Sequence, residues 1–367
     1  MKAIQRSYLN AAKYHADAIR HILDLNTVSS DVVSHLNCLY NDLVKRIGSI
    51  YESPQIRPAN IFCYNFGSSV KMLITVNGVV VGENPYWLEI LPFVLSKNNH
   101  YELIVPNATV LDYKNEGPFA PLLHHNHYGH FIGDSLGKIV HYQNELPNMT
   151  ILTVEPIDSI KKEIRLHCES KSIKYLPCPP IGSGFLYTNL LLELDIMQPW
   201  LYLLFLARQR IIYESKQSRE GVLFLLRKDR RRSRITNLED ILNLCSDIGG
   251  KIEYAEDHSI GDISKILSIY QVIVTEAGSC HLNAMIAASK YTHIIALTPL
   301  PMLAQPTQDM VLGGWPYIGF HPMLELFTSY AYESCESTPI TSWRCSYSPQ
   351  DLKKLILKCS FQPLLQC

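Results

Sequence analysis

The chain has 367 residues, of which 47% are hydrophobic and 18% charged, and its formal net charge is −1. This length and composition fit an ordinary globular protein of two domains, and they argue against disorder and low complexity. The near-neutral charge provides no general field that would recruit nucleic acid or an anionic membrane.

The ten cysteines are scattered and none forms a Cys-x-x-Cys pair, so neither a zinc site nor a thioredoxin-type site is expected. The N-terminal residues lack the apolar core of a signal peptide. We therefore expect reduced thiols and a cytoplasmic location. The apolar run 200–207 is shorter than the roughly 20 residues that span a bilayer. A buried helix is expected there, with an interfacial helix as the alternative.

The predicted elements change in character along the chain. Residues 1–52 place apolar side chains at helical spacing and are expected to form helices. Next, Asn77-Gly78 separates two short apolar runs, 72–76 and 79–81, and this pattern predicts a β-hairpin. Further strands are expected at 102–105 and 109–112.

From residue 128 onward, predicted helices and strands alternate, which predicts parallel sheets covered by helices on both faces. The first series is helix 128–142, strand 150–154, helix 157–168 and strand 173–176, and it ends at the proline-rich stretch 177–180. The apolar stretch 190–213 is interpreted as a long helix. The second series has strands at 222–226, 251–254, 272–275 and 292–297, with helices at 238–248, 260–270 and 280–288.

These patterns predict an α/β protein of two Rossmann-like domains, with boundaries at 1–185 and 186–345. Residues 346–367 contain a further helix, near 349–357, that could pack back onto the first domain.

Polar residues follow the strand predicted at 272–275. Glu276, Gly278 and Ser279 stand at its carboxyl end, where ligands bind in open α/β sheets, and Asn283 lies one turn into the next helix. Free N–H groups at a helix start suit a diphosphate. A Gly-Ser pair at a helix start is also common without any ligand.

A basic run follows the strand predicted at 222–226. Arg227 and Arg234 are expected at the ligand-binding edge of the sheet, where guanidinium groups could neutralise phosphate, and Asn237 precedes the next helix. Such a run can also be a solvated loop or a nucleic-acid patch. We expect residues 230–232 to face solvent.

The segment 124–135 is rich in histidine. His130 and Asp134 are four residues apart, so on a helix they share one face. A His-Asp pair suits a general base or a substrate-orienting pair, and a structural pair and a metal site are the alternatives. His125 and His127 stand in or next to the preceding loop, where a histidine could contact a substrate.

These three segments, in this order, resemble glycosyltransferase family 61, which includes bacterial capsular polysaccharide enzymes. The matching positions are His127, His130 and Asp134, then Arg227, Arg234 and Asn237, then Gly278, Ser279 and Asn283. The resemblance covers roughly residues 120 to 290. Many relatives carry His-Gly-Ala-Gly in the last motif, whereas this chain has Glu276-Ala277-Gly278-Ser279, as in the bacterial branch.

The resemblance implies a GT-B fold, with two Rossmann-like domains that face each other across a cleft. It further implies an inverting transfer from a nucleotide sugar, with uridine diphosphate as the expected nucleotide, to a glycan acceptor in capsular or other surface polysaccharide synthesis. No metal and no cofactor beyond the donor are expected.

In this interpretation the first domain binds the acceptor, and Asp134 or His130 is the catalytic base. His125 and His127 are then expected on the acceptor side. The second domain binds the donor through Arg227, Arg234, Asn237, Glu276, Gly278, Ser279 and Asn283. For Asn237 and Asn283, the alternative is that they fix loop geometry and do not contact the ligand. The enzyme could associate with the inner face of the plasma membrane or with a polysaccharide assembly complex. The alternatives are a nucleotide-sugar epimerase or hydrolase of the same fold, and a non-catalytic sugar-nucleotide-binding subunit of such a complex.

Overall fold

The structure is a computed structural model. The residues it describes are 55–67, 70–81, 88, 91–98, 100–105, 108–114, 116–122, 128–146, 148–156, 158–167, 173–194, 219–230, 233–276, 278–287, 292–297, 319–323 and 346–361. The helices predicted within 1–52, the apolar run 200–207 and the loop with His125 and His127 lie outside these residues. No helix in the described parts of the chain combines the length and the apolar character needed to cross a membrane.

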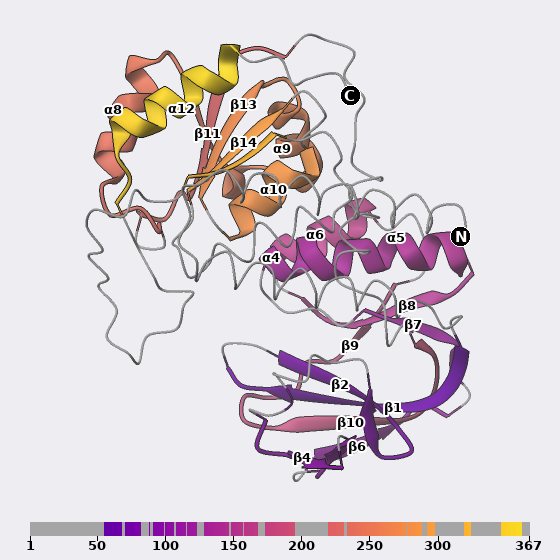
Figure 1. Ribbon diagram of the computed structural model, residues 1–367. Coiled ribbons are helices and arrows are strands. Elements are labelled where there is room, and N and C mark those ends of the chain that lie inside the picture. Colours follow the sequence, from indigo (N-terminus) through magenta and orange to yellow (C-terminus); the bar gives the residue numbers. More distant parts are fainter. Residues whose placement is uncertain are drawn as a thin grey trace. The chain divides into compact units, whose positions relative to one another are not determined.

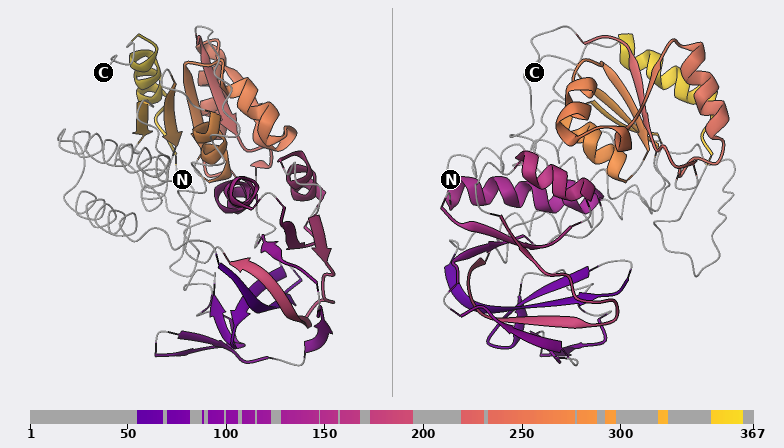
Figure 2. Two further views of the ribbon diagram at one scale, coloured as in Figure 1. Left: turned by 90° about the vertical axis from the view of Figure 1, so that its right-hand side faces the viewer. Right: turned by 180° about the vertical axis from the view of Figure 1, so that it is seen from behind.

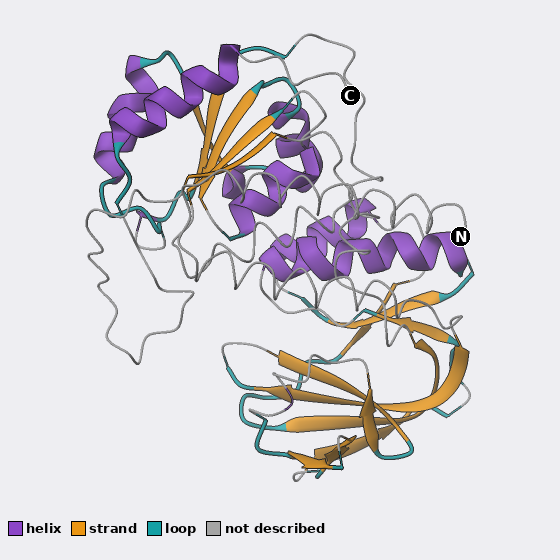
Figure 3. Ribbon diagram, viewed as in Figure 1, coloured by secondary structure: helices purple, strands orange, loops and turns teal. Residues whose placement is uncertain are grey.

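The described residues belong to two compact units, which divide at Leu206 and Ala207. The first unit contains a mixed sheet of 10 strands, and the second contains a parallel sheet of 5 strands. Figure 3 shows that strands dominate the first unit, whereas in the second a sheet lies between helices.

One part of the first sheet is antiparallel and includes the predicted hairpin. β2 (Val70–Val76) and β3 (Val79–Val81) pair across Asn77 and Gly78, whose φ angles are 52° and 81°. Two positive φ angles are what a tight two-residue hairpin turn requires. The other strands of this part are β1 (Gln55–Asn65), β4 (Val94–Lys97), β5 (His100–Leu103) and β10 (Gly184–Leu194).

Strand β10 differs from the sequence prediction. Residues 190–194, expected as the start of a helix, continue a strand that pairs with β1 on one side, and with β6 (Ala108–Asp112) and β7 (Phe119–Pro121) on the other. The strand also crosses the predicted domain boundary at residue 185. Leu190 and Leu192 are fully buried in the first core. A continuous run of leucines fits a buried strand as well as a buried helix, so periodicity could not separate the two.

The remaining part of the first sheet is parallel, in the order β7, β8 (Thr150–Val154) and β9 (Ile173–Leu176). A helical segment connects β7 to β8, and α6 (Asp158–His167) connects β8 to β9. Among the described residues of the first unit, these three parallel strands follow the alternating pattern predicted from residue 128 onward, and the antiparallel strands depart from the Rossmann-like domain expected there. The helical segment consists of α4 (Tyr128–His130), a π-helical turn at Phe131–Ser135 and α5 (Leu136–Glu145).

The second unit is a doubly wound sheet in the order β12-β11-β13-β14-β15, with all neighbours parallel. Figures 1 and 2 show α8 and α12 on one face of this sheet, and α9 and α10 on the other. The bounds are β11 (Val222–Leu226), α8 (Leu238–Asp247), β12 (Lys251–Tyr254), α9 (Ile260–Leu267), β13 (Val272–Glu276), α10 (Ser279–Ala287), β14 (His293–Leu297), β15 (Gly319–Met323) and α12 (Pro349–Phe361).

The C-terminal helix α12 belongs to the core of the second unit, whereas the sequence analysis suggested contact with the first domain. Leu352, Ile356 and Cys359 are buried against Phe224 on β11 and Val274 on β13. These three side chains recur at spacings of four and three residues, so they form one apolar stripe that covers the sheet.

Candidate functional site

The strand order of the second sheet defines a place where a ligand can bind. β11 is the first strand of this unit in the chain, and its neighbours are β12 on one side and β13 on the other. The chain therefore leaves β11 toward one side and returns to its other side later. In doubly wound sheets, ligands bind at the carboxyl ends of the strands at such a reversal. Here the reversal lies between Leu226 and Glu276.

Two arginines converge at this place. Arg227 directly follows β11, and Arg234 lies in the same loop, residues 227–237, which we call the arginine loop. A side chain on Gly278 would overlap Nη2 of Arg227, and Nη2 of Arg234 lies 3.7 Å from that same point. Both predicted arginines thus lie beside the glycine that precedes α10.

Arg234 is buried, with 7% of its surface exposed. The pKa of its guanidinium is lowered to about 10, mainly by burial and also by repulsion from Arg227, while Glu276 opposes both effects. Among the described residues, two guanidinium groups lie beside the carboxylate of Glu276 at a place where Arg234 and Glu276 are buried. An anion at this point would be attracted strongly, since few water molecules screen it.

Glu276 lies at the last position of β13 and is fully buried. Its Oε1 accepts the backbone N–H of Arg227 at 3.0 Å. Its Oε2 accepts the backbone N–H of Arg234 at 2.8 Å and the hydroxyl of Ser233 at 3.1 Å. Both carboxylate oxygens therefore bind the arginine loop, whereas the sequence analysis assigned Glu276 to the donor sugar nucleotide.

The start of α10 is shaped by Gly278, whose φ is 111°. Its N–H donates to Nδ1 of His281 at 2.9 Å, so the neutral ring carries its proton on Nε2. Ser279 is the first residue of the helix, and its carbonyl accepts Nδ2 of Asn283 at 3.1 Å. Asn283 is fully buried, and among the described residues no hydrogen-bond donor reaches its Oδ1.

The sequence analysis did not identify Ser233 and Cys280 as parts of this site. Ser233 stands within the basic run, where nothing distinguishes its hydroxyl from that of a solvated loop. The guanidinium of Arg227 hydrogen-bonds the buried thiol of Cys280, whose pKa is raised mainly by burial. A protonated thiol there helps to hold the Arg227 side chain in place.

The exposed cations of the arginine loop pair with carboxylates. Nζ of Lys228 lies 2.5 Å from Oδ1 of Asp257, and Arg230 forms an ion pair with Glu239 at the start of α8. Both cations are more than 60% exposed. Arg230 therefore faces solvent as predicted, and Arg231 and Arg232 lie outside the described residues. The loop thus separates exposed ion pairs from the two arginines beside Gly278.

Asn237 binds the chain's own backbone. Its Nδ2 donates to the carbonyl of Tyr347 at 2.9 Å, and its Oδ1 accepts the N–H of Tyr347 at 3.0 Å. The residue that ends the arginine loop is thereby tied to the segment that leads into α12. These contacts fit a role of Asn237 in fixing the geometry of the arginine loop.

The predicted catalytic pair lies in the first unit. The backbone of His130 ends α4, and that of Asp134 lies in the π-helical turn. Their side chains are outside what the structure describes. The residues around them, Phe131, Ile132, Ser135 and Leu136, are fully buried. A π-helical turn inside an α-helix is rare and occurs frequently at functional sites.

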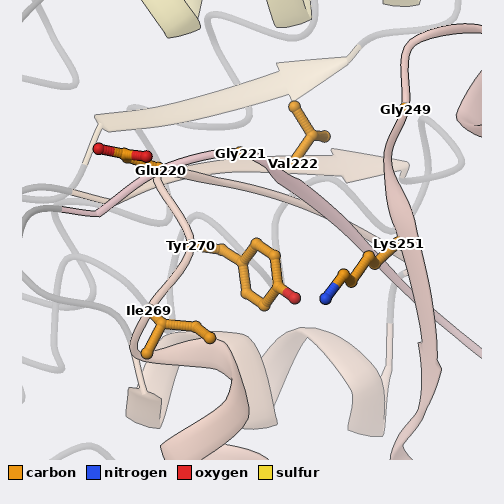
Figure 4. A pocket seen from close by; sticks show the side chains of 7 residues that line it. All are labelled: Glu220, Gly221, Val222, Gly249, Lys251, Ile269 and Tyr270. Atoms are coloured by element: carbon orange, nitrogen blue, oxygen red, sulfur yellow. The ribbon is translucent and has the colours of Figure 1, made fainter.

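A surface hollow of about 700 Å³ lies at the opposite end of the strands of the second sheet. Figure 4 shows its lining side chains, among them Lys251 at the start of β12 and Tyr270 just before β13. These residues mark the amino ends of the strands. The hollow is therefore separate from the arginines, which stand at the carboxyl ends.

Comparison with known protein families gives a match over part of the chain. Residues 128–295 match the profile of a family of glycosyltransferases, and this match supports transferase activity. The family is described as Glycosyltransferase 61, so the resemblance found in the sequence motifs is supported. The matched region begins at Tyr128 and includes His130, Asp134 and every predicted donor-binding residue, but not His125 and His127. No match to a curated protein was found.

Proposed function

We propose that the chain is an inverting glycosyltransferase that transfers a sugar from a nucleotide-sugar donor to a glycan acceptor. The expected nucleotide is uridine diphosphate, and the expected pathway is the synthesis of a capsular or other surface polysaccharide. The observation that carries this proposal is the convergence of Arg227 and Arg234 on Gly278 at the reversal point of the second sheet. The family match supports the same class of reaction.

A diphosphate has the chemistry that this arrangement suits. It presents several acceptor oxygens and a multiple negative charge, and guanidinium groups bind such oxygens in pairs. The start of α10 adds the positive end of a helix dipole. In our proposal, Arg227, Arg234, Gly278 and Ser279 bind the diphosphate, and Asn283 contributes from the next turn of the helix.

The proposed reaction is a single displacement. A base, Asp134 in our first assignment and His130 in the second, removes the proton from the acceptor hydroxyl. The oxygen attacks the anomeric carbon from the face opposite the leaving group, and the bond from that carbon to the diphosphate oxygen breaks. The two arginines stabilise the negative charge that develops on the departing diphosphate.

We further propose a GT-B arrangement, with the donor on the second domain and the acceptor on the first. A cytoplasmic enzyme of this kind would meet its nucleotide sugar directly. Association with the inner face of the plasma membrane or with a polysaccharide assembly complex would bring it to its acceptor.

Ligand-induced stabilisation of the purified chain tests the donor assignment. The chain is heated with a panel of nucleotides and nucleotide sugars, and its melting temperature is recorded. At a hundredfold excess over Kd, a bound ligand adds about 2.7 kcal/mol of stability. We expect nucleoside diphosphates and their sugars to raise the melting temperature, and nucleosides to do so less. Absence of a shift with every nucleoside diphosphate would contradict the proposal.

Product analysis then separates transfer from the alternative reactions. The chain is incubated with the stabilising nucleotide sugar, with and without candidate glycan acceptors. A transferase releases the nucleoside diphosphate mainly when the acceptor is present, and it elongates the acceptor. Equal release of free sugar without acceptor would indicate a hydrolase, and conversion of the sugar while it stays attached to the nucleotide would indicate an epimerase.

A further inference from the structure

The carboxylate of Glu276 is buried, and both of its oxygens are already hydrogen-bonded to other residues of the protein. It is fully buried, and its two oxygens accept three hydrogen bonds from the arginine loop, at 2.8 to 3.1 Å. The donors are the backbone of Arg227, the backbone of Arg234 and the hydroxyl of Ser233. Ser233 is itself buried and also accepts the N–H of Ile235 at 3.2 Å.

The same carboxylate therefore binds the backbone N–H groups of both Arg227 and Arg234. It does so from the end of β13, two residues before Gly278, where both guanidinium groups converge. The side chain of Glu276 thus fixes the position of the arginine loop relative to the start of α10. A displaced loop would move both guanidinium groups away from the helix start together.

We propose that Glu276 is a positioning residue that builds the anion site by fixing Arg227 and Arg234, and that it does not bind ribose or sugar hydroxyls. This inference rests on the proposed function, in which the two arginines bind the diphosphate. A buried carboxylate suits the task because hydrogen bonds to an ionised acceptor are about twice as strong as neutral ones. Its charge also offsets the repulsion between the two guanidinium groups.

The two roles predict opposite effects on a ligand that has no sugar. Inorganic pyrophosphate presents the diphosphate group of the donor but neither ribose nor hexose hydroxyls. If Glu276 bound those hydroxyls, its replacement would leave pyrophosphate affinity unchanged, or would raise it because a negative charge is removed. If Glu276 positions the arginines, its replacement must weaken pyrophosphate binding although the repelling charge is gone.

The experiment is calorimetric titration of pyrophosphate into the full chain and into Glu276→Gln. Glutamine is isosteric but turns an amide NH₂ toward one of the backbone N–H donors, so the loop cannot keep all three hydrogen bonds. We expect at least about tenfold weaker binding, the change in affinity that corresponds to losing one such interaction. Glu239→Gln, an exposed carboxylate of the same unit, is the control and should bind as the unaltered chain does.

Ser233→Ala is the second variant, and it decides the question if Glu276→Gln does not fold. It removes one of the three donors and leaves the carboxylate and both arginines in the chain. We expect pyrophosphate binding about threefold weaker. Unchanged affinity in a folded Glu276→Gln, or in Ser233→Ala where Glu276→Gln does not fold, would overturn the positioning role. If the unaltered chain binds no pyrophosphate, the anion site itself fails, and the proposed function fails with it.

Discussion

Asn237 and Tyr347 exchange two hydrogen bonds, although 110 residues separate them in the sequence. The side-chain amide of Asn237 thereby pairs with both backbone groups of Tyr347, as a neighbouring strand would. Asn237 ends the arginine loop, and Tyr347 is buried just before α12. The pair joins the C-terminal helix to the loop that carries the proposed phosphate ligands.

The first prediction concerns this pair. Asn237→Ala leaves a backbone N–H and a carbonyl of Tyr347 without their partner, which costs about 1–3 kcal/mol in the free energy of unfolding. Asn237→Asp keeps the acceptor but turns a carboxylate oxygen toward the carbonyl of Tyr347 and the carboxylate of Asp240, so its loss should be at least as large. Denaturant unfolding of the two variants measures both values. The exposed neighbour Glu239→Gln should change stability by less than about 0.5 kcal/mol, and equal losses in all three variants would contradict the assigned role.

The second prediction concerns Gly278. In Gly278→Ala the new Cβ would overlap Nη2 of Arg227, and the φ of 111° is unfavourable for alanine. Gly249→Ala is a matched control, since its φ of 66° is also positive but nothing lies within 4 Å of the added Cβ. We expect both variants to lose stability through backbone strain, about 1–2 kcal/mol. Only Gly278→Ala should also weaken nucleotide binding, as measured by the thermal shift with uridine diphosphate.

The third prediction separates the arginines by their surroundings. Lysine keeps the positive charge but loses the planar fork that binds two oxygens at once. Arg227→Lys and Arg234→Lys should therefore lower kcat/KM for the donor by about 10- to 100-fold, which corresponds to one or two lost charge-assisted hydrogen bonds. Arg230→Lys should have no effect, because Arg230 is exposed and pairs with Glu239. A similar loss in all three variants would instead indicate a general effect of charge geometry in the loop.

The fourth prediction concerns pH. The side chain of His141 on α5 is buried, and burial, with a smaller effect from Lys138, lowers its pKa from 6.5 to about 4. Because the folded pKa is the lower one, the unfolded chain binds the proton first as the solution is acidified. The contribution of neutral His141 to the free energy of unfolding is therefore fully present above pH 6.5, and it is lost as the pH falls toward 4. The shift corresponds to at most about 3 kcal/mol.

Unfolding free energies measured between pH 7 and pH 4 test this. His141→Gln should be less stable at pH 7 and should show a shallower fall on acidification. His100→Gln, at an exposed position of β5, should follow the pH profile of the unaltered chain. An unchanged slope in His141→Gln would show that other groups dominate the acid response.

The fifth prediction concerns the proposed base. Asp134→Asn should lower turnover by about 10²-fold or more while the fold and donor affinity stay intact, since this is the lower range for the loss of a general base. Asp158→Asn, at the exposed start of α6 in the same unit, serves as control. Turnover near the original value in Asp134→Asn, combined with a large loss in His130→Gln, would move the base to His130.

Much of the second unit could be predicted because β11, β13 and β14 are short apolar runs, and because a distinct helix follows each of β11, β12 and β13. β11 and β12 have the predicted bounds, and β13 and β14 differ from them by one residue each. The place of Arg227 and Gly278 at one edge follows from the parallel order of these strands. Local sequence was sufficient for β11 to β14 because each connection between these successive strands contains a helix, α8, α9 or α10.

The parts that could not be predicted depend on contacts between distant residues. The run of leucines at 190–192 became a strand because β1 and β7 offer hydrogen bonds on both of its sides. Glu276 and Asn237 look like ligand residues in the sequence, since polar side chains at the carboxyl edge often are. Their partners, Ser233 and Tyr347, lie 43 and 110 residues away, and no local pattern reveals such pairs.

The hydrogen bonds of Glu276 also determine when the site can exist. Residues 227–234 leave the ribosome long before residue 276, yet their backbone donors have no carboxylate to bind until β13 is in place beside β11. A nascent chain that ends before residue 276 therefore holds both arginines without the group that orders them. In our proposal the anion site is complete only when β13 lies beside β11 and Glu276 reaches the arginine loop. A phosphate-bearing ligand at that site would stabilise the folded domain over any form in which β13 has separated from β11.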